Sequence, residues 1–189
     1  SSGANGSVVM TTYVAFLRGI NVGKERRVRT ADIKALMESL GYASVVTYLQ
    51  SGNFVFQAEA TSSEEVSRDL SKAMKKRFDF EVPVLVLTGE GLLAVLDGNP
   101  LSSREDLDLD KLHATILAGH PAGNGENALL SACHPSEEIA LGERAIYLYC
   151  PEGYRNTSLT NSFIEERLGL SATTRNWRTV TALAELVRS

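Results

Sequence analysis

The sequence predicts an α+β protein made of two ferredoxin-like lobes, each with an antiparallel or mixed sheet and helices on one face. In the first half, apolar runs and helical stripes follow in the order β-α-β-β-α-β. The second half repeats β-α-β-β-α and ends in one more helix. The breaker Asp-Gly-Asn-Pro at 97–100 separates the halves. We therefore expect lobes at residues 10–97 and 112–189, a linker at 98–111, and a cloning remnant at 1–9 before a native start at Met10.

The elements of the first lobe follow from local patterns. Thr30 suits a helix N-cap, and Ser62 with Glu65 forms a capping box. Pro83 fits a sheet edge because proline donates no backbone hydrogen bond. The expected strands are residues 13–17, 45–49, 54–56 and 82–87, and the expected helices are residues 30–40 and 62–77.

The second lobe is read in the same way. Gly142-Glu143 joins two short strands into a hairpin, and Gly169 closes a helix. The expected strands are residues 113–117, 138–141 and 145–149, and the expected helices are residues 125–133, 159–168 and the segment from 177. A further short helix, residues 90–96, is expected at the end of the first lobe, before the linker.

Composition narrows the class of protein. Hydrophobic residues make up 43% and charged residues 22% of the chain, which is ordinary for a soluble globular protein. The net charge is −4; residues 1–100 hold 11 basic and 11 acidic groups, and residues 101–189 hold 8 and 12. This balance argues against a general nucleic-acid binder. The chain has two cysteines, Cys133 and Cys150, which predicts reduced thiols and a cytoplasmic location. No apolar run is long enough to predict a membrane span.

Polar residues gather at two bends that the predicted topology brings together. Arg18, Gly19 and Asn21 follow the first strand, and Ser51, Gly52 and Asn53 precede the third. Because these strands are central neighbours in a split βαβ sheet, both bends should lie beside the helix start at Thr30. Gly23 permits a second bend before the basic loop 24–29, which begins at Lys24 and reaches over the same corner. The sequence thus predicts an anion-binding corner. The alternative is that Ser51, Gly52 and Asn53 are ordinary turn residues.

A second cluster, Arg175, Asn176 and Trp177, precedes the last helix. Asn176 suits an N-cap, and Trp177 suits a core anchor. Alternatively, Arg175 and Arg178 flank the indole to bind an anion or stack on a ring. The three histidines lack metal-ligand spacing, so no metal site is expected. No nucleotide-binding glycine loop or catalytic motif occurs, so catalytic residues and cofactors stay unassigned.

Three motifs resemble a known family: YVAFLRGINVG at 13–23, TYLQSGN at 47–53 and TRNW at 174–177. Together they are similar to the bacterial family called domain of unknown function 1697 (DUF1697), over nearly the whole chain from Met10. The resemblance implies an α+β protein with two ferredoxin-like lobes and brings no established activity, cofactor or catalytic residue. This chain has Lys24 where the family usually has glycine and Arg29-Thr30 where it has proline-methionine. It also has Ser158 and Ala182 where lysines are frequent, so any chemistry of those lysines would be lost here.

The leading hypothesis is a small cytoplasmic protein that binds an anion, a nucleotide or a phosphorylated metabolite at the corner of Arg18 and Asn21. One alternative is an enzyme that uses Arg175, Asn176 and this corner across a cleft between the lobes. Another is an RNA-binding sheet face carrying Phe54 and Phe56, although we expect the core to bury both rings. The sequence does not predict an oligomeric state.

Overall fold

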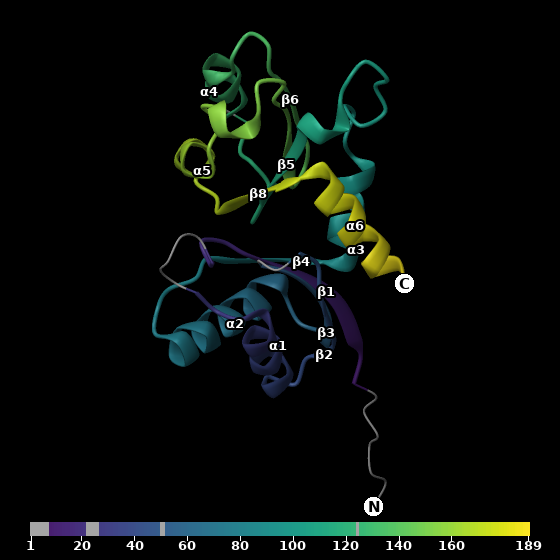
Figure 1. The fold of residues 1–189 in the computed structure, drawn as a ribbon, viewed down its shortest axis with the longest axis vertical. Helices are drawn as coiled ribbons and strands as arrows, with labels where there is room; N and C mark the ends of the chain where they lie inside the picture. Colours follow the sequence, from purple (N-terminus) through teal and green to yellow (C-terminus); the bar gives the residue numbers. More distant parts are fainter. Residues whose placement is uncertain (1–7, 22–26, 50–51, 124) are drawn as a thin grey trace, which may run out of the picture. The chain divides into compact units, whose positions relative to one another are not determined.

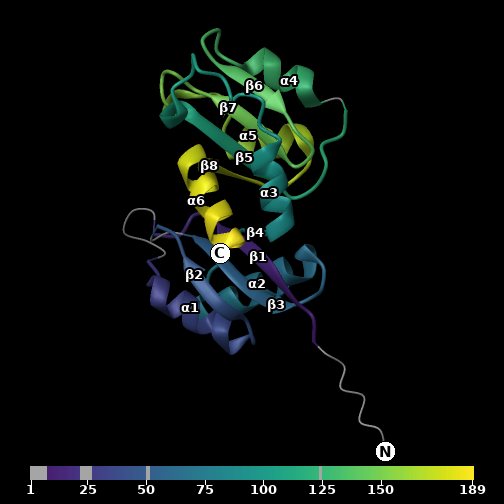
Figure 2. The same ribbon diagram turned by 90° about the vertical axis from the view of Figure 1, so that its right-hand side faces the viewer.

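The computed structural model describes residues 8–21, 27–49, 52–123 and 125–189 (Figures 1 and 2). The chain divides into two compact units, residues 1–89 and 90–189. Each unit contains a four-stranded antiparallel sheet with helices packed against it. None of the described helices combines the length and apolar character that crossing a membrane requires.

The first unit has the ferredoxin-like topology that the sequence predicts. Its sheet order is β2-β3-β1-β4, with every neighbouring pair antiparallel. The order places β1 and β3 in the middle of the sheet and β4, which begins directly after Pro83, at an edge. The elements are β1 (Met10–Leu17), α1 (Thr30–Ser39), β2 (Ala43–Thr47), β3 (Asn53–Glu59), α2 (Ser63–Phe78) and β4 (Val84–Thr88).

Both helices of this unit cover one face of its sheet (Figure 1). Alternate residues of β1 point toward them, because side chains on a strand alternate between its two faces. Tyr13 and Phe56 are fully buried on this face, and the Tyr42 ring stacks on Phe56 at a centroid distance of 4.7 Å. Ile33 and Met37 bring α1 onto the same cluster. The core thus fixes where α1 begins relative to the sheet.

The helix starts differ from each other in their capping. The Ser62 hydroxyl accepts a hydrogen bond from the Glu65 amide at 3.1 Å, so the predicted cap of α2 is confirmed. The predicted cap of α1 is wrong. Thr30 is already the first helical residue, and the N-cap position belongs to Arg29, whose side chain makes no capping hydrogen bond. The backbone of Arg29 is extended and that of Thr30 is helical, so α1 begins one residue earlier than an N-cap at Thr30 would place it.

The second unit repeats the topology with a strand that the sequence did not reveal. Its sheet order is β6-β7-β5-β8. The new strand β8 is polar, so the apolar run that marks the other strands is missing from its sequence. The elements of the second unit are α3 (Gly89–Asp97), η1 (Leu109–Lys111), β5 (Leu112–Leu117), α4 (Gly125–Ala132), β6 (Glu138–Leu141), β7 (Ala145–Tyr149), η2 (Tyr154–Asn156), α5 (Asn161–Leu168), β8 (Ala172–Asn176) and α6 (Trp177–Arg188).

Thr174 of β8 is held by a partly buried chain of hydrogen bonds. The Thr115 and Thr174 hydroxyls lie 2.7 Å apart across the β5–β8 pair, and the Thr174 hydroxyl donates to Asn161 Oδ1 of α5 at 2.6 Å. This chain satisfies groups whose burial would otherwise be costly. A polar segment can therefore pair as a strand here.

Helices cover both faces of the second sheet. Leu129 of α4 and Ile164 of α5 pack with residues of β5 and β7 on one face. On the other, Tyr147 of β7 packs edge-on against Trp177 of α6 at 6.2 Å. The Tyr147 hydroxyl also donates to the Val95 carbonyl of α3 at 2.7 Å. Tyr147 thus ties the sheet to both terminal helices of this unit.

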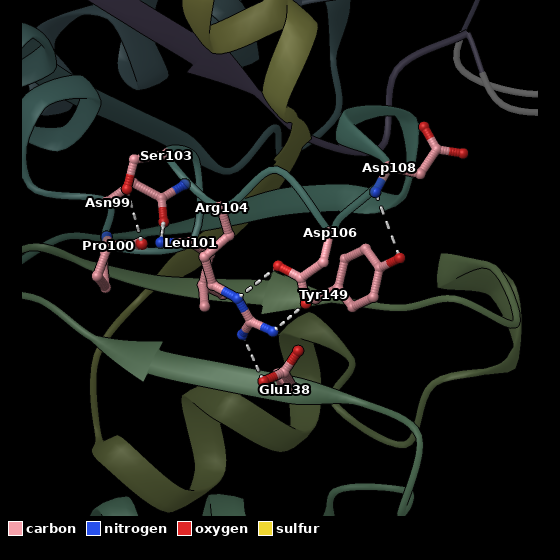
Figure 3. Close-up of polar contacts among 9 residues, drawn as sticks. All are labelled: Asn99, Pro100, Leu101, Ser103, Arg104, Asp106, Asp108, Glu138 and Tyr149. Carbon is pink, nitrogen blue, oxygen red and sulfur yellow. Dashed lines mark hydrogen bonds and ion pairs between the residues drawn. The ribbon is translucent and has the colours of Figure 1, made fainter.

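The segment between α3 and η1 contacts the second sheet through Arg104 and through Asp108, whose amide donates to the Tyr149 hydroxyl of β7 at 3.4 Å (Figure 3). Arg104 donates to both carboxylate oxygens of Asp106, at 3.1 and 2.6 Å, and to Glu138 of β6 at 2.6 Å. Asn99 Oδ1 accepts from the Leu101 amide at 2.9 Å, which shapes the turn that follows α3. We name this arrangement of Arg104, Asp106 and Glu138 the arginine clasp.

Candidate functional site

The two predicted bends lie side by side in the first unit. Phe16 and Asn53 are register partners in the β1–β3 pair, and the Leu17 amide donates to the Gly52 carbonyl at 2.8 Å. On the other side of β1, the Arg18 amide donates to the Pro83 carbonyl at 3.0 Å. The end of β1 is therefore fixed from both neighbouring strands, as the predicted topology requires.

Glycine is required at the second bend. Gly52 has a φ of +86°, and a Cβ atom placed there would lie less than 3.0 Å from the Leu17 carbonyl oxygen. It would also lie 3.2 Å from the Leu17 Cβ. At the first bend, Gly19 has a φ of +76°. Both bends use left-handed backbone that side chains disfavour.

Asn53 has a structural role in this corner. Its side chain is 4% exposed, and its Nδ2 donates to the Tyr48 carbonyl at 3.2 Å. The Tyr48 amide donates in turn to the Asn53 carbonyl at 3.0 Å, so the two residues close the turn between β2 and β3. Ser51, Gly23 and Lys24, which the sequence also nominated, lie outside the described residues.

A pocket of about 810 Å³ opens at the start of α1, and we call it the α1 pocket. It contains one of the nominated residues, Asn21, together with the helix start at Thr30. The basic loop 24–29, which the sequence placed over this corner, contributes Arg27 and Arg29. Among the described residues, Arg18, Gly52 and Asn53 do not line it. Its described lining residues are Asn21, Arg27, Val28, Arg29, Thr30, Thr47 and Leu49.

Asn21 holds the loop in front of α1. Its φ of +56° is left-handed, a conformation that asparagine tolerates better than most residues. Its Oδ1 accepts a hydrogen bond from the Val28 amide at 2.8 Å. The side-chain oxygen is engaged by this bond. The donor that the Asn21 side chain can offer a ligand is its Nδ2 group.

The electrostatic field in the α1 pocket favours anions on balance. The N-terminus of a helix carries a partial positive charge, and at the start of α1 the Arg29 side chain makes no capping hydrogen bond. Two exposed arginines add full positive charges. Asp32 opposes them, since its Oδ2 lies 3.2 Å from Arg29 Nε. The ion pair with Asp32 uses the Nε edge of the Arg29 guanidinium. A guanidinium group carries further N–H donors, and its planar fork suits carboxylate and phosphate oxygens.

The residues of the second cluster make structural contacts in the second unit. Arg175 donates to the Thr173 hydroxyl at 2.7 Å and to the Thr174 carbonyl at 3.0 Å. Asn176 caps α6, because its Oδ1 accepts from the Arg178 amide at 2.8 Å. Trp177 is 5% exposed and packs on Tyr147. The N-cap and the core anchor that the sequence suggested are both present.

Other chemistry has little support in the described part of the chain. No group of three potential metal-ligating residues is present there. Burial raises the pKa of the Cys150 thiol to about 12, so this thiol stays protonated at neutral pH. Phe54 and Phe56 are fully buried in the core of the first unit, as expected, and offer no stacking surface for bases.

The Thr47 and Leu49 sides of the pocket were not anticipated. Thr47 ends β2, and Leu49 follows it with a φ of +54° and 60% exposure. In the sequence, Leu49 completes an apolar run that predicts a buried strand residue. Only the turn at Gly52-Asn53 hinted that the chain leaves the sheet before this position.

Comparisons with known proteins agree with this fold. The model of the family described as "Protein of unknown function (DUF1697)" matches residues 10–147. The structure of the conserved bacterial protein SP0830 from Streptococcus pneumoniae aligns with a TM-score of 0.71 and 23% sequence identity. The alignment covers 95% of this chain and 99% of that one, and at this identity it supports the fold alone. None of the curated proteins matches the chain.

Proposed function

The chain belongs to the DUF1697 family, whose function is unknown, and from its geometry we propose that it binds a small anion in the α1 pocket. The class of ligand we propose is a nucleotide or another phosphorylated metabolite. The observation that carries the proposal is the presence of Arg27, Arg29 and the N-terminus of α1 around one pocket. We also propose a cytoplasmic location, which two free cysteines support.

The proposal accounts for how the corner is constructed. Gly52 and the paired ends of β1 and β3 form a rigid base, and Asn21 leads the chain away from it toward the start of α1. Preorganised donors bind an anion without reordering, which reduces the entropic cost of binding. Arg18 leaves β1 at the same bend and is half-buried, so it belongs to this base rather than to the described lining.

The test compares two double variants that each remove two positive charges from the first unit. Arg27→Gln/Arg29→Gln changes the pocket, and Lys34→Gln/Lys72→Gln changes exposed positions on α1 and α2 outside it. Thermal unfolding is followed with inorganic phosphate, sulfate or AMP. A ligand at about 100 times its dissociation constant stabilises the folded state by roughly 2.7 kcal/mol, which raises the melting temperature by several degrees.

The matched control is needed because phosphate and sulfate stabilise many proteins through exclusion from their surfaces. We expect stabilisation in the wild type and the lysine variant and its loss in the arginine variant. Lost charge-assisted hydrogen bonds weaken binding by about tenfold or more. If no anion stabilises the wild type, or if both variants respond equally, the α1 pocket is not an anion site.

A further inference from the structure

The α1 pocket has an apolar side as well as a cationic one. Val28, which is 7% exposed, and Leu49, which is 60% exposed, border it together with Arg27 and Arg29. An inorganic oxyanion needs only donors and positive charge, so it would make no use of the apolar side. The lining therefore contains more than a free oxyanion requires.

Leu49 is kept at the pocket by an unfavourable backbone conformation. Its φ of +54° is left-handed, where a bulky side chain costs roughly 1–2 kcal/mol relative to ordinary backbone. Glycine or asparagine would adopt the same turn more easily. Such conformations persist where the surrounding structure determines them, and they concentrate at ligand sites. The turn thus holds a large apolar side chain in water at the edge of the pocket.

The size of the α1 pocket agrees with an organic ligand. Its volume of about 810 Å³ falls in the range of roughly 300–1,000 Å³ that is usual for small-molecule sites. A free phosphate ion fills only a small part of such a space. Val28 and Leu49 line the pocket beside the arginines, so an apolar or planar group has apolar side chains to pack against there.

We infer that the ligand is an organic anion, in which an anionic group that meets Arg27 and Arg29 is joined to an apolar or planar body covering Leu49. This inference rests on the proposed function and narrows its ligands to anions that carry an apolar or planar body. Leu49 then determines specificity, because it contributes to affinity only when the ligand carries that body. Phosphate esters with a ring are bound in preference to those with a small alkyl group.

The experiment measures calorimetric binding of two phosphate monoesters, methyl phosphate and phenyl phosphate, to the full chain. Their anionic groups are alike and their bodies differ. The variant is Leu49→Ser, and the control is Leu130→Ser, which removes a leucine of similar exposure from α4 in the other unit. We expect the wild type and the control to prefer phenyl phosphate by about tenfold, the factor expected when part of a leucine surface leaves water.

In Leu49→Ser this preference should fall close to one, while the affinity for methyl phosphate stays unchanged. A wild type that binds both esters equally, or a preference that survives Leu49→Ser, overturns the inference and leaves the proposed anion site intact. If neither ester binds the wild type, the proposed function fails and the inference fails with it.

Discussion

Replacing Gly52 with alanine tests the corner on which the candidate site is built. Gly52 and Gly41 have nearly the same backbone, with φ values of +86° and +87°. Around Gly41 there is nothing within 4 Å of an added Cβ, whereas at Gly52 the Leu17 carbonyl oxygen would lie closer than 3.0 Å. Gly41→Ala therefore carries the same conformational penalty without the steric conflict, and it is the matched control.

The expected costs follow from these contacts. A left-handed alanine costs roughly 1–2 kcal/mol, offset by about 0.4–1 kcal/mol because alanine also restricts the unfolded chain. Gly41→Ala should therefore destabilise the first unit by about 1 kcal/mol. At Gly52 the backbone must also move away from Leu17, which strains the 2.8 Å hydrogen bond between them and overpacks the site. That adds roughly 1–3 kcal/mol, so Gly52→Ala should cost about 3 kcal/mol.

The measurement must resolve the first unit, because its unfolding need not coincide with that of the second. Hydrogen exchange read on peptides from β1 and β3 gives the free energy of opening there. The single tryptophan, Trp177, lies in the second unit, so its fluorescence reports on that unit and cannot replace this measurement. If Gly52→Ala costs no more than Gly41→Ala, the close approach of the two bends is not real.

Two further predictions concern protonation. Burial, the Asp69 charge and Tyr13 raise the pKa of Tyr42 from 10.0 to about 12 in the folded protein. Between pH 10 and about 12 the tyrosine is therefore deprotonated in the unfolded chain but still protonated in the folded one. The first unit consequently loses stability as the pH rises through this range. Tyr42→Phe should remove part of that loss in alkaline unfolding, and an unchanged pH profile would contradict the assignment. Burial lowers the pKa of His113 below 6.5, so the unfolded chain takes up this proton first as pH falls. Acid should destabilise the second unit less in His113→Phe, which keeps a ring against Tyr154; an NMR titration of His113 at or above 6.5 would refute the prediction.

The strand order of the first unit could be predicted because its signals are local and agree with one another. Apolar runs of the right length, the Ser62 cap and the position of Pro83 all favour one topology. The strand β8 could not be predicted from its own residues. The hydroxyl of its Thr174 is satisfied by Thr115 and Asn161, which lie on other elements, so the strand depends on partners that no local pattern reveals.

The corner was located by topology, but its lining was not. Pairing of β1 with β3 follows from the fold, and this pairing brings Gly52 beside Leu17. Whether a residue such as Asn53 turns inward to bond Tyr48 or outward to solvent depends on side-chain packing. Leu49 was missed for the same reason, since its exposure follows from a left-handed backbone that leucine rarely adopts.

The arginine clasp has a consequence for how this protein resists self-association. The strand β6 is an edge of the second sheet, and an edge with free backbone groups can recruit strands from other molecules. Glu138 at the start of β6 and Arg104 against it place hydrated charges on that edge. By contrast, β2, an edge of the first sheet, contains no charged residue and relies on a bulge instead. The two sheets share one topology and protect their open edges by different means.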